Sequence, residues 1–513
     1  MRKTTSILVL TTALLGLRAS IAYGQTARGT DSTSVARLDK PHTLSPLLRW
    51  FHSGGGDTTG IEAKPKASDP FAFGDFSWLN GTSRKTTPPA FDSKYFTGDV
   101  TFDLNYTHSY NSPIDNTVVG STALARDNEL QLSFMGFGGD IHYEHIRGRI
   151  MMQFGTRATV VPRNDGSSYK GQYDLQTIYR YISEAYAGYH WDTWHGINLD
   201  AGIFMSYIGL FSYNNFENWG YQPSYTSDNT PWFFNGLRLQ TFPTDKLKVE
   251  FWLVNGWQSY GMFNRSPGIG MSIYYRPKET VDYVFNNYYG KDDEGAPGRL
   301  RFHSDNSYEL RYLNRKSGFI TKAAFSLTGD LGFESGDGVS PFGKKTNSAG
   351  VRLPSQNFIS GMVYNRLWFG EKQKWAWTIG GGYMHNPGQY LVLAPTGYAD
   401  TLYQAQTGVG STFNAWDGST SLDYMPAQNL TLKLEFVHRK VVNIGAAPGT
   451  TPLSGYFAGH GGVTGPTGYT NTGSYTYTSS GASVAPPLSS LGGWQPDMVP
   501  QENRVILALL VRF

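Results

Sequence analysis

Charged side chains placed between apolar ones are the residues of this chain whose types and spacing could do chemistry. Arg147 and Arg149 lie two positions apart, as do Lys248 and Glu250. In a β-strand such positions project from one face, and rows of charge on a polar face can select or orient ions. A simpler role stays open for each residue, since such charges also pair and keep an inner wall hydrated. The candidates for lining a pore are Arg147, Arg149, Arg157, Asp200, Arg238, Lys248, Glu250, Asp305, Glu309, Arg311, Asp423, Lys433, Glu435 and Arg439.

The sequence contains no motif of a known catalytic or metal centre. His142 and His145 lie three positions apart beside an expected turn, whereas zincins need two His residues four apart on a helix. The acidic residues 292–294 could bind calcium through oxygen ligands, but no ligand-spaced partners follow, which favours a solvated loop tip. The chain has no cysteine, which excludes disulfides and thiolate chemistry. We therefore expect no catalytic residue, no metal and no cofactor.

The elements that would position the charges are long β-strands. Over residues 96–107, apolar residues and Gly alternate with Thr, Asp and Asn. This period of two fits a membrane strand tilted by about 45°, whereas a helix would space its apolar residues three and four apart. The same alternation recurs at 146–154, 197–207, 247–253, 302–312 and 430–439.

Connections between these strands alternate in length. Short ones fall at 243–245, 276–279, 314–317, 370–374 and 426–428, and long ones at 108–127, 208–231, 332–356, 386–411 and 441–502. This predicts an all-β fold, a transmembrane antiparallel up-and-down β-barrel of about sixteen strands with short periplasmic turns and long outer loops. A soluble sandwich also alternates, but its strands average about five or six residues.

The first 24 residues have the pattern of a secretory signal peptide. Arg2 and Lys3 precede an apolar stretch at 7–17, and small residues at 22 and 24 offer a cleavage site before Gln25. Cleavage would remove three basic residues and no acidic one, so the net charge falls from +3 to 0. Nothing then indicates a nucleic-acid partner. We expect export to the outer membrane of a Gram-negative cell.

After cleavage the chain divides into a periplasmic lead or pore-inserted segment at 25–92 and a barrel at 93–513. The lead contains an aromatic- and glycine-rich stretch, 71–81. Either this stretch narrows the lumen, with Asp75 and Trp78 as constriction residues, or it fastens the N-terminus to the periplasmic rim. The second role is favoured, because aromatic clusters more often serve packing.

The last strand ends the chain on an aromatic residue. Val505, Leu507, Leu509, Val511 and Phe513 share one face. This ending resembles the terminal signal that the barrel-assembly machinery reads, with Phe513 as its key residue. An ordinary edge strand is the alternative, but a bare apolar edge invites aggregation unless it is closed against another strand.

Two further stretches carry a resemblance to a family. Asp69–Gly81 is followed by the strand at 95–107 and then Pro113–Asp115, while Leu199–Gly209 precedes Asn255-Gly256-Trp257. Together they resemble the OmpL-like β-barrel porin family over roughly 70–513. The resemblance implies a porin for diffusion, and it identifies neither a solute nor a catalytic residue.

The expected partners follow from this interpretation. They are outer-membrane lipid and lipopolysaccharide, the barrel-assembly machinery and small hydrophilic solutes, with a homotrimer expected by analogy with other sixteen-strand porins. Two other functions stay open. One is an adhesin or receptor barrel that binds through its outer loops, and the less favoured one is a barrel hydrolase, which would need Ser/His or Asp/His groups that converge.

Overall fold

The computed structural model describes residues 69–113, 116–121, 124–162, 165, 167, 173–262, 264–293, 296–388, 390–391, 412–444, 455–463, 476–477, 483–484 and 495–513. The predicted signal peptide at 1–24 lies outside the described residues, as does the predicted lead up to residue 68.

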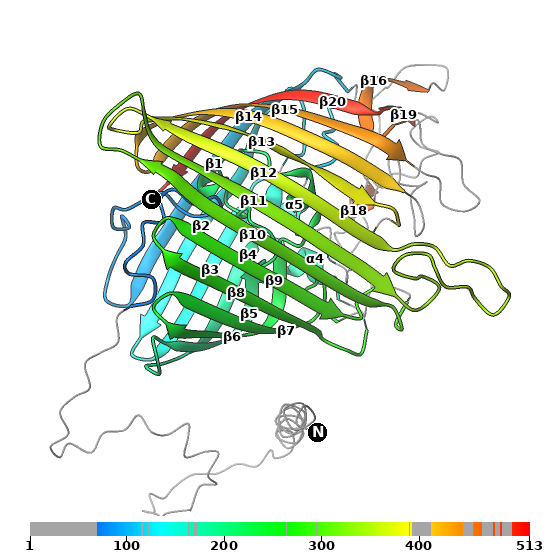
Figure 1. Ribbon diagram of the computed structural model, residues 1–513, viewed down its shortest axis with the longest axis horizontal. Coiled ribbons are helices and arrows are strands. Elements are labelled where there is room, and N and C mark those ends of the chain that lie inside the picture. The colour runs from blue at the N-terminus through cyan, green and yellow to red at the C-terminus, as the bar shows by residue number, and fades with distance from the viewer. Residues whose placement is uncertain are drawn as a thin grey trace, which may run out of the picture. The chain divides into compact units, whose positions relative to one another are not determined.

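Within the described part of the chain, sixteen antiparallel strands close into one barrel in sequence order, and the last strand pairs with the first. This confirms the predicted architecture, and Figure 1 shows the tilted strands. The strands are β1 (Phe96–Ser109), β2 (Leu130–Tyr143), β3 (Ile146–Phe154), β4 (Ile182–Trp191), β5 (Ile197–Met205), β6 (Phe233–Thr244), β7 (Leu247–Val254), β8 (Gly268–Lys278), β9 (Val281–Gly290), β10 (Leu300–Asn314), β11 (Ile320–Ser335), β12 (Asn357–Phe369), β13 (Trp375–Asn386), β14 (Phe413–Ala427), β15 (Leu430–Ile444) and β20 (Gln501–Arg512).

The alternation in β1 explains why this sequence forms a membrane barrel. Thr101 and Asp103 are each 1% exposed, whereas Tyr106 on the opposite face is 38% exposed. Polar side chains therefore lie inside and apolar ones outside, the reverse of a soluble protein and the pattern of a lipid-embedded barrel.

Barrel closure removes the edge that the C-terminal strand would otherwise present. β20 pairs with β15 on one side and with β1 on the other, where Phe102 lies opposite Val511. The backbone N–H of Phe513 donates to the carbonyl of Val100 at 2.8 Å. Its role as an assembly signal stays a prediction.

The predicted short turns are found at one end of the barrel, with bounds that differ from the prediction by up to three residues. The β6–β7 turn is formed by Asp245 and Lys246, the β8–β9 turn by Glu279 and Thr280, and the β12–β13 turn by 370–374. In Figure 1 these turns lie at the left, on the same side as the C-terminus. Pro243 and Thr244 belong to β6 rather than to a turn.

Two long connections at the other end of the barrel carry short helices. The β3–β4 connection contains α3 (Arg157–Val160) and α4 (Leu175–Tyr179), and the β5–β6 connection contains η2 (Asn215–Glu217) and α5 (Tyr225–Asn229). No helix in the described residues is long and apolar enough to cross a membrane.

The connection at 208–231 is long and lies at the end opposite the short turns, as predicted, but it folds into the lumen rather than outward. The Tyr225 N–H donates to Asp417 on the inner face of β14 at 3.0 Å, and Thr226 bonds to Ser360 on β12. This connection carries its own aromatic residues, which pack against apolar residues that the strands turn inward. Two small sheets complete the described residues, β16 (Phe457–Val463) with β19 (Gln495–Val499), and β17 (Thr476–Tyr477) with β18 (Ser483–Val484).

Candidate pore lining

The described chain begins with a segment, residues 69–87, that crosses the short-turn end of the barrel; we call it the strap. The Phe71 N–H donates to the carbonyl of Asp245 in the β6–β7 turn at 2.7 Å. Near its other end, Arg84 donates to the carbonyl of Leu430 on β15 at 2.8 Å. The strap therefore runs from one side of the rim to the other.

Asp75 and Trp78, the predicted constriction residues, lie on the strap. Trp78 is fully buried, and its indole N–H donates to the carbonyl of Glu279 at 3.2 Å. Asp75 forms a 2.8 Å ion pair with Arg311 and lies 3.8 Å from Lys322. These contacts join the strap to the rim and to the inner wall. A constriction role for the two residues stays a prediction.

Three predicted residues on β15 bind the β5–β6 connection. The Lys433 ammonium donates to the carbonyl of Trp219 at 2.8 Å, and Glu435 accepts the Gln222 N–H at 2.9 Å. Arg439, which is fully buried, forms a 2.8 Å ion pair with Asp228 of α5. In the described structure these charges hold a packed segment of chain.

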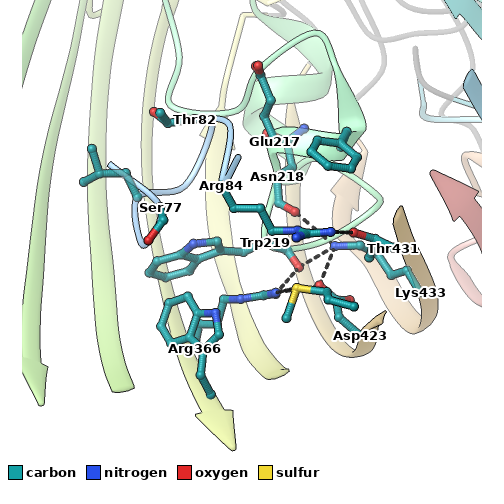
Figure 2. Close-up of a pocket in the computed structure, with 14 residues that line it drawn as sticks. Ser77, Thr82, Arg84, Glu217, Asn218, Trp219, Arg366, Asp423, Thr431 and Lys433 are labelled. Carbon is teal, nitrogen blue, oxygen red and sulfur yellow. Dashed lines mark hydrogen bonds and ion pairs between the residues drawn. The ribbon is translucent and has the colours of Figure 1, made fainter. Parts of the chain in front are cut away.

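Asp423 lies at the centre of a buried charge cluster under the strap. Its carboxylate accepts from Arg366 at 2.7 Å and lies 3.2 Å from the Lys433 ammonium. Figure 2 shows the two cations converging on it beside Trp219. The space left here is a cavity of about 20 Å³, enough for about one water molecule. This part of the lumen is therefore filled.

Arg147 and Arg149 project from β3 as predicted from their spacing, but into different surroundings. Arg149 contacts three carboxylates, those of Asp99, Asp140 and Glu184, at 2.6–2.9 Å. Arg147 lies 3.4 Å from the buried Asp200, and its side chain stays 30% exposed. Arg238 on β6 is the second ion-pair partner of Asp200, at 2.8 Å.

The remaining predicted residues lie on β7 and β10. Lys248 forms a 3.1 Å ion pair with Glu250, and its ammonium lies 3.8 Å from the centre of the Tyr274 ring. Asp305 is 1% exposed, and Glu309 accepts the backbone N–H of Asn80 on the strap at 2.9 Å. Glu309 thus joins the wall to the strap.

A larger cavity separates the strap from the wall on this side. It measures about 360 Å³ and lies between the strap, the start of the β5–β6 connection and the inner faces of β6 to β10. Two of the predicted residues, Lys248 and Glu309, line this cavity. Arg276 and Asp282, which were not predicted, line it as well. It is the larger of these two cavities.

The prediction that Arg157 projects from a strand is wrong. Strand β3 ends at Phe154, and Gly155, with a φ of +101°, turns the chain away. Arg157 begins α3 and is 2% exposed. Its guanidinium donates to the carbonyl of Tyr213 and lies 5.0 Å from that ring. Its role is therefore to join two inward-folded connections.

Asp75 and Arg84 of the strap have shifted pKa values. Partial burial raises the pKa of Asp75, but hydrogen bonds from Ser77 and the charges of Lys322 and Arg311 outweigh it and hold the pKa below its ordinary value. Burial, reinforced by the nearby Arg366 charge, lowers the pKa of Arg84 to about 10. Both groups remain charged at neutral pH, so the ion pairs of the strap persist.

Several inward charges were not predicted from the sequence. Arg366 on β12 is one, because the alternation at 357–385 is weak and β12 turns large apolar residues such as Trp368 inward as well. Arg276 and Asp282 lie beside a turn whose predicted bounds, 276–279, placed Arg276 outside a strand. No group of three or more His, Cys, Asp or Glu residues able to hold a metal occurs in the described residues.

A closed barrel with apolar residues outside and charges inside defines a transmembrane β-barrel of the porin type. Residues 95–465 match the family model described as beta-barrel porin-2, OmpL-like, so the chain belongs to this family. The resemblance inferred from the sequence is thereby confirmed, and the protein is a porin-like barrel of the outer membrane. A search of curated proteins gave no match.

Solved structures with a similar barrel include outer-membrane channels. The channel DcaP of Acinetobacter baumannii is 12% identical, with 83% of this chain and 100% of that chain covered and a TM-score of 0.43. OprB of Pseudomonas putida is 10% identical, with 82% of this chain and 94% of that chain covered and a TM-score of 0.43. An anion-selective porin from Comamonas acidovorans is 10% identical, with 82% of this chain and 99% of that chain covered and a TM-score of 0.42. None of these identifies a solute for this chain.

Proposed function

We propose that this protein is a passive porin through which small hydrophilic solutes and ions diffuse across the outer membrane. The cavity of about 360 Å³ inside the closed barrel carries this proposal. At roughly 30 Å³ per water molecule, it has room for about a dozen of them. Charges of both signs border it, and a hydrated, charged lining suits polar solutes.

The predicted pore-lining residues divide into two groups in this proposal. Lys248 and Glu309 border the path at the cavity, and Arg147 adds a partly exposed charge on β3. Charges such as Lys433 and Arg439 instead hold the β5–β6 connection, which sets how much of the lumen stays open. We propose a channel rather than an enzyme.

The proposal includes the route to the membrane and the assembled state. Export removes a signal peptide at 1–24, so N-terminal sequencing of the protein from outer membranes should begin at Gln25. We also propose a homotrimer, and light scattering on the detergent-solubilised protein should give three chains per particle. A single chain per particle would contradict the trimer without affecting the pore.

Swelling of proteoliposomes tests solute diffusion. Vesicles that contain the purified protein should swell in an isosmotic solution of a small sugar such as arabinose and stay unchanged in dextran. Protein that was heat-denatured before reconstitution is the matched control. Equal rates with native and denatured protein would overturn the proposal.

A further inference from the structure

The strap divides the lumen into two unequal parts. Toward β12–β15 it covers the cluster of Arg366, Asp423 and Lys433, where only about 20 Å³ is left. Toward β6–β10 the opening measures about 360 Å³, which lies in the range of small-molecule binding pockets. The larger of the two cavities therefore lies against the β6–β10 wall.

Formal charges in the open cavity balance and are held by the protein. Lys248 is paired with Glu250 at 3.1 Å, and Arg276 lies 3.6 Å from Asp282. Glu309 accepts a backbone N–H from the strap. Two cations and two anions among the lining residues leave no net charge, so neither a cation nor an anion is favoured as the bound solute.

Two hydrogen-bond donors of residues that line the cavity are nevertheless left without an acceptor in the described residues. The amide Nδ2 of Asn80 and the Nη1 of Arg276 are buried, and neither has a hydrogen-bond acceptor among the described residues. Both residues are 2% exposed and line the cavity. Burying such donors without acceptors is costly, so these two residues indicate a site for a polar ligand.

Acceptors lie close to these donors. Asp282 on β9 is directly opposite Glu309 on β10, and each carboxylate has about four lone-pair positions, of which the protein uses few. A ligand group that both donates and accepts would suit this arrangement, and a hydroxyl does both.

Four aromatic rings form another part of the lining. Phe71 and Phe76 of the strap are 6.4 Å apart, edge to face, and Phe242 on β6 lies 6.3 Å from Phe71. Tyr274 on β8 completes the set. Aromatic surface accepts the apolar side of an amphipathic ligand, and a few convergent polar groups then fix its orientation.

We propose that this cavity is a binding site for an uncharged, polyhydroxylated ring, that is, a small neutral sugar, which rests there during passage. The aromatic rings receive the C–H face of the sugar. Asn80 and Arg276 donate to its oxygens, and Asp282 and Glu309 accept from its hydroxyls. This inference rests on the proposed diffusion function for its biological meaning, but the site itself can be tested without flux.

The direct test is to measure the binding of glucose to the purified full-length protein in detergent by saturation-transfer NMR. Saturable binding of D-glucose is expected, with weaker binding of arginine and of glutamate at the same concentration. If glucose shows no saturable binding, or if either charged solute binds more tightly than glucose, the proposal is overturned. Conductance in a bilayer with no glucose binding would remove this site and leave the porin function standing.

Two conservative substitutions locate the site. Asn80→Asp keeps the acceptor that binds the Trp219 N–H and removes the donor, and Glu309→Gln keeps the shape and removes the charge. Each substitution should weaken glucose binding by at least about tenfold, because one hydrogen bond to a charged or buried partner is lost. The controls are Asn314→Ala and Glu371→Gln, both exposed near the short-turn end. Wild-type affinity in Asn80→Asp and Glu309→Gln would place the glucose elsewhere.

Discussion

Arg366 on β12 and Asp423 on β14 form a 2.7 Å ion pair across the intervening strand β13, and both side chains are almost completely buried. The pair lies under the strap and next to Trp219 of the inward-folded connection. It thus joins the barrel wall to the segments that fill the lumen.

Removal of this arginine should destabilise the protein strongly. Arg366→Ala leaves Asp423 with Lys433 as its one ion-pair partner within 4 Å in the described residues, and breaking a buried pair costs about 3–5 kcal/mol. Urea unfolding in detergent would measure the loss. Arg126→Ala is the matched control, since its ion pair with Glu129 is largely exposed and worth about 1 kcal/mol or less. Equal losses would contradict a structural role for Arg366.

A side chain at Gly81 should displace the strap. Gly81 has a φ of +72°, and an added Cβ would lie 2.1 Å from the carbonyl oxygen of Leu210. Gly81→Ala should therefore raise the pore current as well as lower stability. In the control, Gly338→Ala, the φ of +86° is equally strained but nothing lies within 4 Å, so only the backbone cost of about 1–2 kcal/mol applies. An unchanged current in Gly81→Ala would mean that the strap does not restrict the path.

Acid should loosen the strap only below the ordinary pKa of an aspartate. Because the folded pKa of Asp75 lies below its ordinary value of 3.8, its contribution is present at higher pH and is lost as the pH falls through the folded pKa. The difference in unfolding free energy between wild type and Asp75→Asn should therefore be constant from pH 8 to about 5 and shrink in stronger acid. A decline that begins near neutral pH would contradict this assignment.

Reversal of one partly exposed charge should change ion preference. Arg147 keeps 30% of its side chain exposed beside Asp200. Arg147→Glu should move the reversal potential in a salt gradient toward that of a cation-preferring pore. Lys316→Glu, in the exposed β10–β11 turn, is the control and should have a smaller effect. An unshifted potential in Arg147→Glu would remove this residue from the selective path.

The wall of the barrel could be predicted from the sequence, because alternation in a strand is a local property. Residues 96–107 already separate the buried Asp103 from the exposed Tyr106. The contents of the lumen could not be predicted in this way. Residues of the β5–β6 connection, such as Tyr221 and Trp219, follow no period, and their burial depends on contacts with β15 that are far away in sequence.

The candidate site shows the same division. Parity placed Lys248 and Glu309 on the inner face, where they line the open cavity. It could not distinguish them from Arg439, which also faces inward but is fully buried against α5. Asn80 was not predicted at all, because it lies on the strap, where no regular spacing indicates direction.

Single-channel recording tests the central claim most directly. The purified wild-type protein would be reconstituted in a planar lipid bilayer between solutions of potassium chloride, and the current measured at constant voltage. The account predicts stepwise increases to a steady conductance as barrels insert. A bilayer that stays silent, although the protein is folded and inserted, would contradict it.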